Sequence, residues 1–374
     1  MSPDIETSPR IVFAALETFS LVGGLQNFNR RVIANLSART LEKQLPKPRI
    51  LLLRDRDSVP ADLSFIAKGY SSRWSYLVRS VVASLSADIF IIGHVNLLPL
   101  AAMIRCVRWK LPILLFVHGD EVWNDPSQRK KRWYESFLIH AVNRIASVSN
   151  YTARVMSREF GVPTEKFSLL PNAVDPIAPL PPRTAGPPTV LTVTRLDRRD
   201  RDKNVTQMID AIGILKSRVP NVRYEIVGAG SLLDELRARA EERGLSDTVV
   251  FHGRVSPAHL DEAYRRATVF ALPSSKEGFG IVYLEAWLRE LPVICSCFGA
   301  SHEIVSDQED GFVVDSRSPE EIAERLFQLL SAPPLAQKFG ESGRRKVEKM
   351  YLNRSFRKNL DRLVDDTIGQ SVKT

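Results

Sequence analysis

The sequence predicts an α/β protein made of two doubly wound parallel sheets joined by a proline-rich linker. Short apolar runs alternate with amphipathic stretches along the chain, which is typical of parallel strands covered by helices on both faces. One interruption stands at residues 176–188, where six prolines and Gly186 gather. The 374 residues, 44% hydrophobic and 25% charged, exceed one ordinary domain and can bury sizeable cores.

The first half of the chain carries five predicted strands and three predicted helices. The strands are expected at 10–16, 49–53, 89–92, 113–117 and 144–148. The helices are expected at 25–36, 71–86 and 129–142. Each strand is a short run of apolar residues, and each helix has apolar residues at helical spacing. This order is typical of a first doubly wound domain over residues 1–175.

The alternation restarts after the linker and predicts a second domain over residues 189–353. Its strands are expected at 189–194, 224–227, 249–252, 269–272 and 293–295. Its helices are expected at 205–217, 232–243 and 281–289. Proline blocks both helices and ladders, so residues 176–188 are predicted to be a linker. The tail, 354–374, is predicted to be helical from 354 to 368 and to cross back to the first domain.

The positive charge of the chain is concentrated in its first half. The formal net charge is +9, and residues 1–172 hold 23 Lys and Arg against 14 Asp and Glu. Residues 173–374 hold 29 of each kind. The asymmetry favours an anionic partner of the first half: a membrane surface, a phosphorylated acceptor or nucleic acid. Ordinary basic surface is the alternative, and no recognition module for nucleic acid is visible.

The sequence shows no sign of secretion or of a membrane span. Residues 1–10 lack the apolar run of a signal peptide. The longest apolar stretch, 89–104, is interrupted by His94, Asn96 and Pro99. The three cysteines allow no even disulfide framework and are expected to be small buried residues. We expect a cytoplasmic protein.

Two glycines, Gly23 and Gly24, stand between the first predicted strand and its helix. Without a Cβ they let a ligand approach the backbone, and the start of a helix offers N–H groups to an anion. A tight strand-to-helix turn would use the same two residues, so both interpretations stay open. A histidine, His118, follows another strand of this domain and could bond a sugar or acceptor hydroxyl, although a lone histidine is often structural.

Two cations follow the first strand of the second domain. Arg195 comes directly after that strand, and Lys203 precedes the next helix. At the carboxyl end of a strand they face the ligand side of the sheet, where they could clamp a diphosphate and stabilise it as a leaving group. Residues 197–202 between them are densely charged, so a solvated loop is the alternative. Gly228 and Gly230 after a later strand suit nucleotide approach, but such turns are common.

Two glutamates, Glu277 and Glu285, flank a glycine-rich run. The run contains Gly278, Phe279 and Gly280. Within one helix the two carboxylates would stand about 80° apart, whereas the glycines favour Glu277 in a loop and Glu285 in the helix that follows. Carboxylates accept hydrogen bonds from the paired hydroxyls of sugars and riboses. We expect both to point into one pocket; two unrelated surface glutamates are the alternative.

Taken together, these residues resemble the retaining GT-B glycosyltransferases of family four, the glycosyl transferases group 1. The ordered set covers both halves of the chain, and Glu277-x7-Glu285 is its most specific part. The resemblance implies two Rossmann-like domains with an inter-domain cleft: an acceptor-binding domain at 1–175 and a nucleotide-sugar-binding domain at 189–353. The chain departs from the usual pattern at Thr194, Ala173 and Lys276, which leaves the substrate open.

The resemblance also implies roles for the motif residues. Arg195 and Lys203 would bind the donor diphosphate, Glu277 the transferred sugar and Glu285 the ribose, and His118 would lie near the sugar. The set implied to bind the donor comprises Gly23, Gly24, Arg195, Lys203, Gly228, Gly230, Glu277, Gly278, Phe279, Gly280 and Glu285. The set implied in catalysis comprises Glu277, Arg195, Lys203 and His118. The family needs no metal ion and no cofactor besides its nucleotide-sugar substrate.

The expected function is therefore retaining, metal-independent transfer of a hexose from a GDP- or UDP-linked sugar to a glycan or lipid-diphosphate-linked acceptor. The amino-acid sequence at residues 279–285 is similar to that of mannosyltransferases of exopolysaccharide assembly that use GDP-mannose. Cations mixed with aromatics at 73–79 and 129–134 suit an anionic bilayer, and the core is the alternative place for those aromatics. Peripheral docking on the inner face of the plasma membrane is expected.

Three other functions compete with this one. A metal-dependent glycosyltransferase would use Asp-x-Asp, as in Asp55-Arg-Asp57 or Asp200-Arg-Asp202, although the arginine inside each would oppose a cation. A sugar-nucleotide epimerase or a phosphorylase could use the same fold. A non-catalytic sugar-nucleotide binder would be expected to lose Arg195, Lys203 or Glu277, and all three are present.

Overall fold

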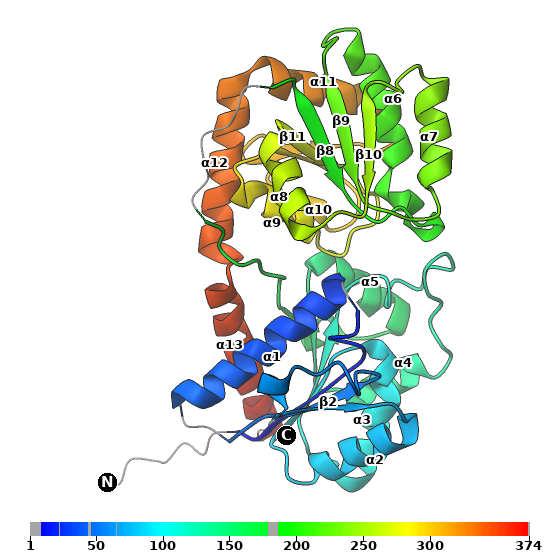
Figure 1. Cartoon of the computed structure of the whole chain (residues 1–374). Coiled ribbons are helices and arrows are strands. Elements are labelled where there is room, and N and C mark those ends of the chain that lie inside the picture. The colour runs from blue at the N-terminus through cyan, green and yellow to red at the C-terminus, as the bar shows by residue number, and fades with distance from the viewer. Residues whose placement is uncertain (1–8, 22, 44–45, 65, 179–185, 373–374) are drawn as a thin grey trace. The chain divides into compact units, whose positions relative to one another are not determined.

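The computed structural model describes residues 9–21, 23–43, 46–64, 66–178 and 186–372, and Figure 1 draws its elements. Contacts divide the chain into two compact units. The first unit runs to Asn172 and resumes at Phe356; the second is Ala173–Ser355. Of the linker predicted at 176–188, residues 179–185 lie outside the described residues.

The first unit is built on a seven-stranded sheet in which every pairing is parallel. The strand order is β3-β2-β1-β4-β5-β6-β7. The strands are β1 (Ile11–Ala15), β2 (Arg49–Leu53), β3 (Ala67–Tyr70), β4 (Ile89–Ile92), β5 (Ile113–Val117), β6 (Arg144–Ser147) and β7 (Phe167–Leu169). All residues of β1, β4 and β5 are buried, as continuous apolar runs of a sheet covered on both faces should be.

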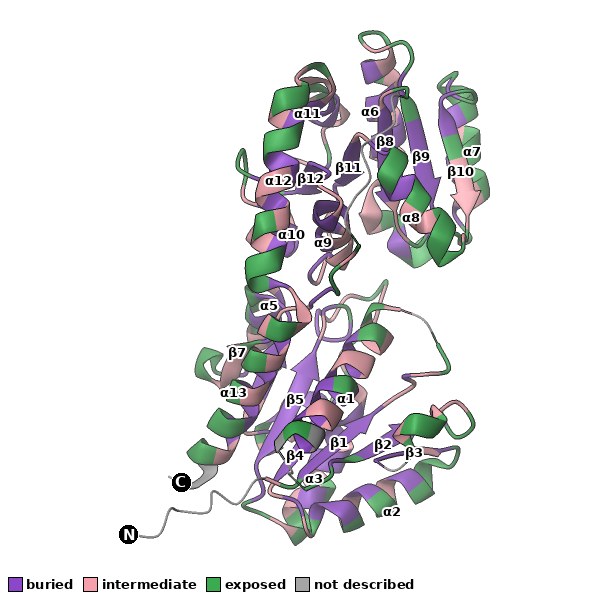
Figure 2. Ribbon diagram, turned by 60° about the vertical axis from the view of Figure 1, so that its left-hand side comes forward, coloured by how far each residue is buried: buried purple, intermediate pink, exposed green. Residues whose placement is uncertain are grey.

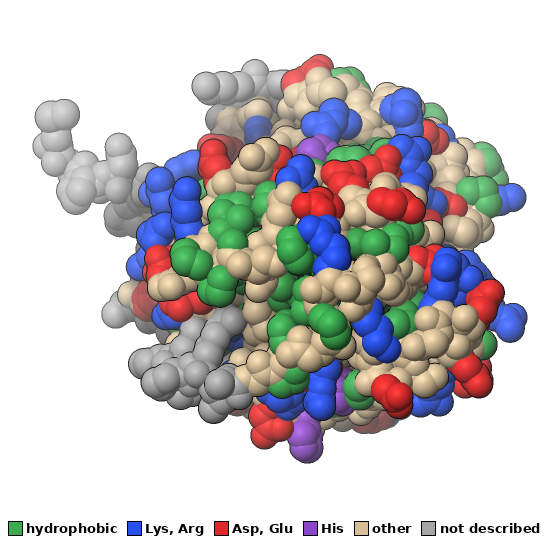
Figure 3. Space-filling view, turned by 90° about the horizontal axis from the view of Figure 1, so that it is seen from above, with side chains coloured by type: hydrophobic (Ala, Val, Ile, Leu, Met, Phe, Trp, Pro, Cys, Tyr) green, Lys and Arg blue, Asp and Glu red, His purple; other side chains and the backbone are tan. Residues whose placement is uncertain are grey.

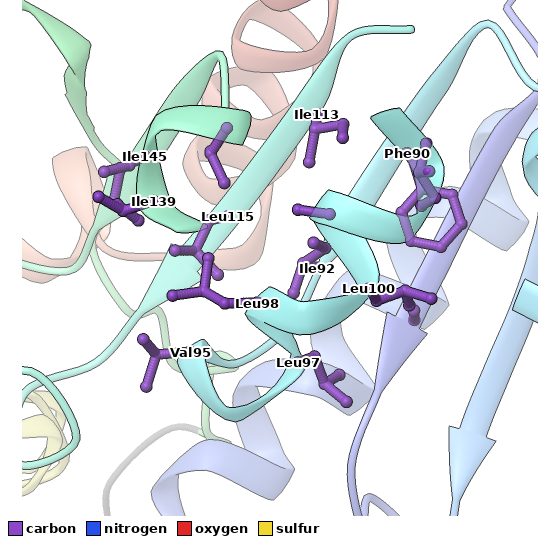
Figure 4. Packing of buried hydrophobic residues seen from close by; sticks show 14 of the residues in the cluster. Phe90, Ile92, Val95, Leu97, Leu98, Leu100, Ile113, Leu115, Ile139 and Ile145 are labelled. Carbon is purple, nitrogen blue, oxygen red and sulfur yellow. The ribbon is translucent and has the colours of Figure 1, made fainter. Parts of the chain in front are cut away.

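Helices cover this sheet and complete the first unit. They are α1 (Gly24–Lys43), α2 (Arg73–Ser84), α3 (Leu98–Val107), α4 (Glu135–Leu138), α5 (Asn150–Phe160) and α13 (Asn353–Val372). Phe90, Ile92 and Leu115 of the sheet pack against Leu98 and Leu100 of α3 in the main core cluster (Figure 4). Figure 2 shows this pattern, with purple strands and green outer positions on helices such as α2.

The C-terminal helix α13 packs against α1 within the first unit. The rings of Phe28 and Phe356 meet edge to face with centroids 5.4 Å apart. Buried Arg39 donates to Asp361 at 3.1 Å and to Asp365 at 3.2 Å. The predicted tail helix therefore contributes to the core of this unit, and it runs longer than the predicted 354–368.

The second unit carries a six-stranded parallel sheet in the order β10-β9-β8-β11-β12-β13. Its strands are β8 (Thr189–Val193), β9 (Arg223–Val227), β10 (Val249–Gly253), β11 (Val269–Leu272), β12 (Val293–Ser296) and β13 (Gly311–Val314). Its helices are α6 (Val205–Lys216), α7 (Leu233–Glu242), α8 (Pro257–Arg266), α9 (Ile281–Leu288), α10 (Ser301–Ile304), α11 (Pro319–Ser331) and α12 (Pro333–Met350). Of the described helices, none is both long and apolar enough to cross a membrane.

Two expectations from the sequence are wrong. The helix predicted at 129–142 is confined to α4 and a 3-10 turn over Ile139–Ala141. The residues before α4 are not helical, because side chains take their backbone N–H groups: Lys131 N–H donates to Asn124 and Arg132 N–H to Glu135, each at 2.9 Å. The cysteines are not all buried: Cys295 is, whereas Cys106 and Cys297 are exposed.

Each sheet has a point at which the chain reverses its order of strand addition. In the first unit it lies between β1 and β4, and in the second between β8 and β11. Loops leaving the carboxyl ends of two adjacent strands diverge there, which opens a crevice where ligands bind in doubly wound folds. The loops after β1, β4, β8 and β11 are therefore the first places to look for a site.

Candidate functional site

The loops after β8 and β11 bring Lys203 and Glu277 together. The Lys203 ammonium donates to the Glu277 carboxylate at 2.7 Å, although the two residues are 74 positions apart. Their side chains are only 16% and 17% exposed, so each charge is partly withdrawn from water and needs the other. A cation and a carboxylate thus share the switch point of the second sheet.

Hydrogen bonds to backbone carbonyl groups fix the two loops to each other beside this pair. Ser275 N–H donates to the Asp202 carbonyl at 2.8 Å. The Asn204 side chain donates to the Pro273 carbonyl at 2.7 Å, and Asn204 itself adopts the left-handed conformation (φ +56°) just before α6. Lys203 is consequently held between two anchored residues, and its ammonium has a defined position before any ligand arrives.

Arg195 also stands in the loop after β8 but has a different partner. Its guanidinium donates to Asp200 at 2.9 Å, and its side chain is 57% exposed while that of Asp200 is 2% exposed. Residues Arg198–Lys203 form two short 3-10 segments that meet at a kink at Asp200, whose side chain is buried. The segment between Arg195 and Lys203 is thus structured around a buried carboxylate, and it is not the solvated loop that the sequence left open as an alternative.

Glu285 lies on α9, one element further along the chain from Glu277. Tyr264 of α8 donates its hydroxyl to the Glu285 carboxylate at 2.9 Å. Arg289 stacks on the Tyr264 ring at 4.7 Å and donates to Asp261 of the same helix at 2.7 Å. Burial raises the pKa of Glu285, and the hydrogen bond from Tyr264 and the charge of Arg289 oppose that shift. The structure therefore places Glu277 in a loop and Glu285 in the following helix.

The glycine-rich run between the glutamates shapes the loop through its backbone. Gly280 has φ +91°, a left-handed conformation that favours glycine, and stands immediately before α9. A Cβ at Gly280 would lie 2.3 Å from the Tyr283 ring. Phe279 is buried against Tyr351, with ring centroids 5.8 Å apart, whereas Gly278 stays partly exposed in the loop. The side chain of Phe279 thus serves the core of the second unit.

Gly228 and Gly230 are required by contact between two loops of the second unit. A Cβ on Gly228, whose φ is +150°, would stand 1.7 Å from the Thr194 carbonyl oxygen. A Cβ on Gly230 would stand 2.2 Å from the carbonyl carbon of Leu196. Leu196 N–H in turn donates to the Ala229 carbonyl at 3.1 Å. These glycines let the loop after β9 support the loop that carries Arg195.

Gly23 and Gly24 present the opposite case. Within the described part of the chain, neither glycine is found with a positive φ, and a Cβ on Gly24 would meet no described atom within 4 Å. A Cβ on Gly23 would meet only the flexible end of Gln26. The turn into α1 therefore imposes little steric demand for glycine at these positions.

The loop that leads to these glycines is held by Asp55, which follows β2. This buried carboxylate accepts three consecutive backbone N–H groups, from Thr18 at 2.5 Å, Phe19 at 3.1 Å and Ser20 at 2.9 Å. Asp57, two residues on, is almost fully exposed. The oxygens of Asp55 are thus committed to the loop, and the two carboxylates do not face a common point.

The second Asp-x-Asp sequence is committed to other partners in the same way. Asp200 holds Arg195, and Asp202 pairs with Lys276 at 3.4 Å. The structural roles found for these carboxylates are ion pairs and loop support, as for Asp55. Two features of this unit were not predicted from the sequence: the hydrogen bond from Tyr264 to Glu285 and the burial of Asp200.

His118 lies at the carboxyl end of β5 in the first unit. Its Nε2 lies 3.4 Å from the Gly93 carbonyl, so that nitrogen carries the proton, and its ring stands edge-on to Phe28 at 4.7 Å. Burial lowers the pKa of His118 to about 4 and, for the same reason, that of His94 in the loop after β4 to about 4. His94 Nδ1 accepts the Asn96 N–H at 3.0 Å. Two neutral imidazoles thus border the switch point of the first sheet, and the sequence had suggested only one.

Comparison with known families matches both units. A model described as Glycosyltransferase Family 4 matches residues 23–177. A model described as Glycosyl transferases group 1 matches residues 181–346. The two matched ranges follow one another and include every residue that the sequence singled out as a candidate.

Among curated proteins, the chain is similar to a GDP-mannose-dependent alpha-(1-6)-phosphatidylinositol monomannoside mannosyltransferase of Mycobacterium tuberculosis. The two are 33% identical over 225 residues, which is 55% of this chain and 57% of that protein. The match therefore spans little more than half the length of that relative. A D-inositol 3-phosphate glycosyltransferase of Streptomyces bingchenggensis is 24% identical over 79% of this chain and 69% of its own.

Two solved structures share the fold over nearly the whole chain. The lipopolysaccharide outer core galactosyltransferase WaaB superimposes with a TM-score of 0.73 and 18% identity, over 95% of this chain and 99% of the other. Anabaena HepE in complex with UDP superimposes with a TM-score of 0.76 and 15% identity, over 96% and 100%. At these identities the likeness establishes the fold, two Rossmann-like units of GT-B type.

Proposed function

Because the chain belongs to the glycosyl transferases group 1, we propose that it is a retaining hexosyltransferase that takes a sugar from a nucleotide-sugar. The observation that carries the proposal is the loop pair after β8 and β11, which holds Arg195, Lys203 and Glu277 at one switch point. The acceptor is a glycan or a lipid-diphosphate-linked sugar. This proposal sets aside an epimerase, a phosphorylase and a non-catalytic binder.

The chemistry we propose is loss of a nucleoside diphosphate through an oxocarbenium-like transition state. Arg195 and Lys203 stabilise the negative charge that develops on the leaving diphosphate, which is where fixed cations lower a barrier most. Glu277 binds hydroxyls of the transferred sugar, and Glu285 binds the ribose. The departing phosphate takes the proton of the acceptor hydroxyl, so the sugar keeps its anomeric configuration without a protein nucleophile.

The donor we propose is GDP-mannose. The curated Mycobacterium tuberculosis relative is named as GDP-mannose-dependent, and the sequence at 279–285 is similar to that of mannosyltransferases. A solved neighbour of the same fold, HepE, is described in complex with UDP and glucose, so UDP-sugars are the competing donors. The proposal includes no metal ion, because the carboxylates of Asp55 and Asp200 are committed to protein partners.

The experiment that tests this function is a donor panel run in EDTA. GDP-mannose, UDP-glucose, UDP-galactose and UDP-N-acetylglucosamine are each measured for binding and for slow release of the sugar. We expect binding of one nucleotide family and release of a sugar with retained anomeric configuration, read by NMR. Activity that depends on added manganese would contradict the metal-free proposal. If the folded protein bound none of the four nucleotide-sugars, the proposal that it is a glycosyltransferase would be contradicted.

For the acceptor side, we propose that the first unit docks on an anionic bilayer through α2. Four large apolar side chains, spaced so that they fall on one side of the helix, are exposed: Trp74, Val78, Val82 and Leu85. Arg73 and Arg79 flank them, and α2 contains no acidic residue. Exposed apolar stripes with a basic border suit a bilayer interface. Tyr76, in contrast, is buried.

The stripe continues at the end of α3. Arg108 donates to the carbonyl groups of Ser84 and Ala87, which fixes the end of α3 beside the end of α2. Next to it Trp109 is 74% exposed and carries Lys110 over its ring at 4.8 Å. Trp133, at 90%, is exposed in the loop before α4. Exposed tryptophans are uncommon unless they have a partner, and bilayer interfaces favour them.

Figure 3 draws the molecule from above the view of Figure 1, and on that face Lys and Arg side chains are mixed with Asp and Glu. The docking argument itself rests on the exposed apolar side chains of α2. Cosedimentation with vesicles tests the docking surface. Wild type should bind vesicles with anionic lipid more than neutral ones, and Trp74→Ser with Val78→Ser should lose most of that binding. Ile214→Ser with Val250→Ser, two exposed apolar residues of the second unit, is the matched control. Equal binding by both double variants would contradict the proposal.

A further inference from the structure

The buried carboxylate of Asp200 has a role that the sequence motifs do not assign. We propose that Asp200 is a positioning residue, which holds the guanidinium of Arg195 ready for the diphosphate of the donor. The inference rests on the proposed function of Arg195. It follows from the place of Asp200 in the loop, from its burial and from the state of its two oxygens.

The place of Asp200 is fixed from both ends of its loop. Asp200 N–H donates to the Asp197 carbonyl at 2.7 Å. On one side Leu232 N–H donates to the Leu196 carbonyl at 2.7 Å, and on the other Ser275 N–H donates to the Asp202 carbonyl at 2.8 Å. The backbone on either side of Asp200 is therefore tied to the neighbouring loops of the unit, and its side chain has little freedom to turn outward.

The two oxygens of Asp200 differ in their surroundings. Oδ1 accepts from Arg195 at 2.9 Å, whereas Oδ2 is buried and has no hydrogen-bond partner among the described residues. A buried carboxylate with one unsatisfied oxygen depends on its counter-ion, because nothing else offsets the loss of water. Asp200 should therefore hold Arg195 strongly, although the arginine side chain is itself more than half exposed.

The geometry leaves most of the guanidinium available. The hydrogen bond to Asp200 uses one Nη2 donor, and a guanidinium has further N–H donors in the same plane. Those donors can form the paired bonds that arginine makes with phosphate. An unrestrained arginine would have to give up its rotamer freedom when the ligand binds, so an arginine fixed beforehand binds more tightly.

The experiment measures binding of GDP and UDP by calorimetry to wild type and to Asp200→Asn, a variant of the same shape without the charge. For the nucleotide that wild type binds, we expect the dissociation constant of Asp200→Asn to be about tenfold higher. Arg195→Gln should weaken binding further. Asp200→Asn should add little in the Arg195→Gln background, because both changes remove the same interaction between Asp200 and Arg195. Losses that simply add would overturn the proposal.

A matched control is available in the same loop. Arg201 donates to Glu235 at 2.6 Å in an exposed ion pair, whereas the hydrogen bond found for Arg195 goes to Asp200. Glu235→Gln removes that pair and should leave GDP and UDP binding unchanged. If Glu235→Gln weakens binding as much as Asp200→Asn does, the effect belongs to the loop as a whole and the positioning role is wrong.

A second measurement needs no nucleotide. The order parameter of the Arg195 Nε–H bond, measured by NMR in the ligand-free protein, should be high in wild type and in Glu235→Gln and should fall in Asp200→Asn. An equally mobile Arg195 in wild type would refute the positioning role. Failure of wild type to bind any nucleotide would instead refute the proposed function, so the two failures are distinguishable.

Discussion

A fall in pH should lower the free energy of unfolding through His118, and the size of the effect follows from the surroundings of that residue. The imidazole is partly buried, packs against Phe28 and donates to the Gly93 carbonyl. Burial lowers its pKa to about 4, below the value of about 6.5 that an unfolded chain would show. The folded state therefore favours the neutral ring, and the unfolded state binds more protons between these two values.

The sign and magnitude follow from proton linkage. Because the folded pKa of His118 is depressed, its stability contribution is complete above pH 6.5 and is lost as the pH falls toward 4. At pH 5 the loss from this one residue amounts to about 2 kcal/mol of unfolding free energy. His94, whose pKa burial also lowers to about 4, should add a similar loss. The groups around His94 are Glu121, Arg129, Arg132 and His118.

The assay compares wild type with His118→Asn, which keeps a hydrogen-bonding side chain but does not titrate. Urea unfolding is measured at pH 8 and pH 5, and the fall in stability should be smaller in the variant by about 2 kcal/mol. The remaining acid-sensitive groups are the same in both proteins, so the difference reports on His118. An NMR titration of His118 with a midpoint near 6.5, or equal acid sensitivity of the two proteins, would refute the reasoning.

Three further predictions concern residues that form the two switch points or support the loops there. Lys203→Met should weaken donor binding by at least tenfold and lower the melting temperature, because the carboxylate of Glu277 loses its counter-ion. Glu277→Gln should lower the melting temperature less. Calorimetry measures the binding and thermal melts measure the stability of both variants. Gly24→Ala should fold normally and lose turnover, whereas Gly228→Ala should fail to fold, as expression and circular dichroism would show. Asp55→Ala should cost about 3 kcal/mol of stability by leaving three N–H groups unpaired, and a normal melting temperature would contradict this.

The fold was largely predictable from the sequence where strands are buried on both faces. Runs such as 113–117 are apolar throughout, so their strand character is evident from the residues alone. Strand β3, Ala-Lys-Gly-Tyr, has no such pattern, and its place beside β2 depends on a Gly69 that lets Asp55 approach. Helix α3 was missed because its apolar residues continue those of β4 almost without a break, and periodicity does not separate such runs.

The site was predictable in its residue types but not in its pairings. The sequence placed Arg195, Lys203, Glu277 and Glu285 at strand ends or in the helix that follows, and the structure places them there. Which carboxylate meets which cation depends on contacts over tens of residues, such as the 74 positions between Lys203 and Glu277. No local pattern carries that information. The same limit explains why Tyr264, the partner of Glu285, was not predicted.

The two Asp-x-Asp sequences show how one local pattern can serve an end opposite to the one it suggests. A divalent ion needs carboxylates that converge on a point open to solvent. In both sequences here the first aspartate is turned inward: Asp55 collects three backbone N–H groups, and Asp200 holds Arg195. Each thereby fixes a loop or side chain next to a switch point. In a fold whose proposed chemistry depends on fixed cations, buried carboxylates are useful as supports, since they order the groups that meet the anionic ligand.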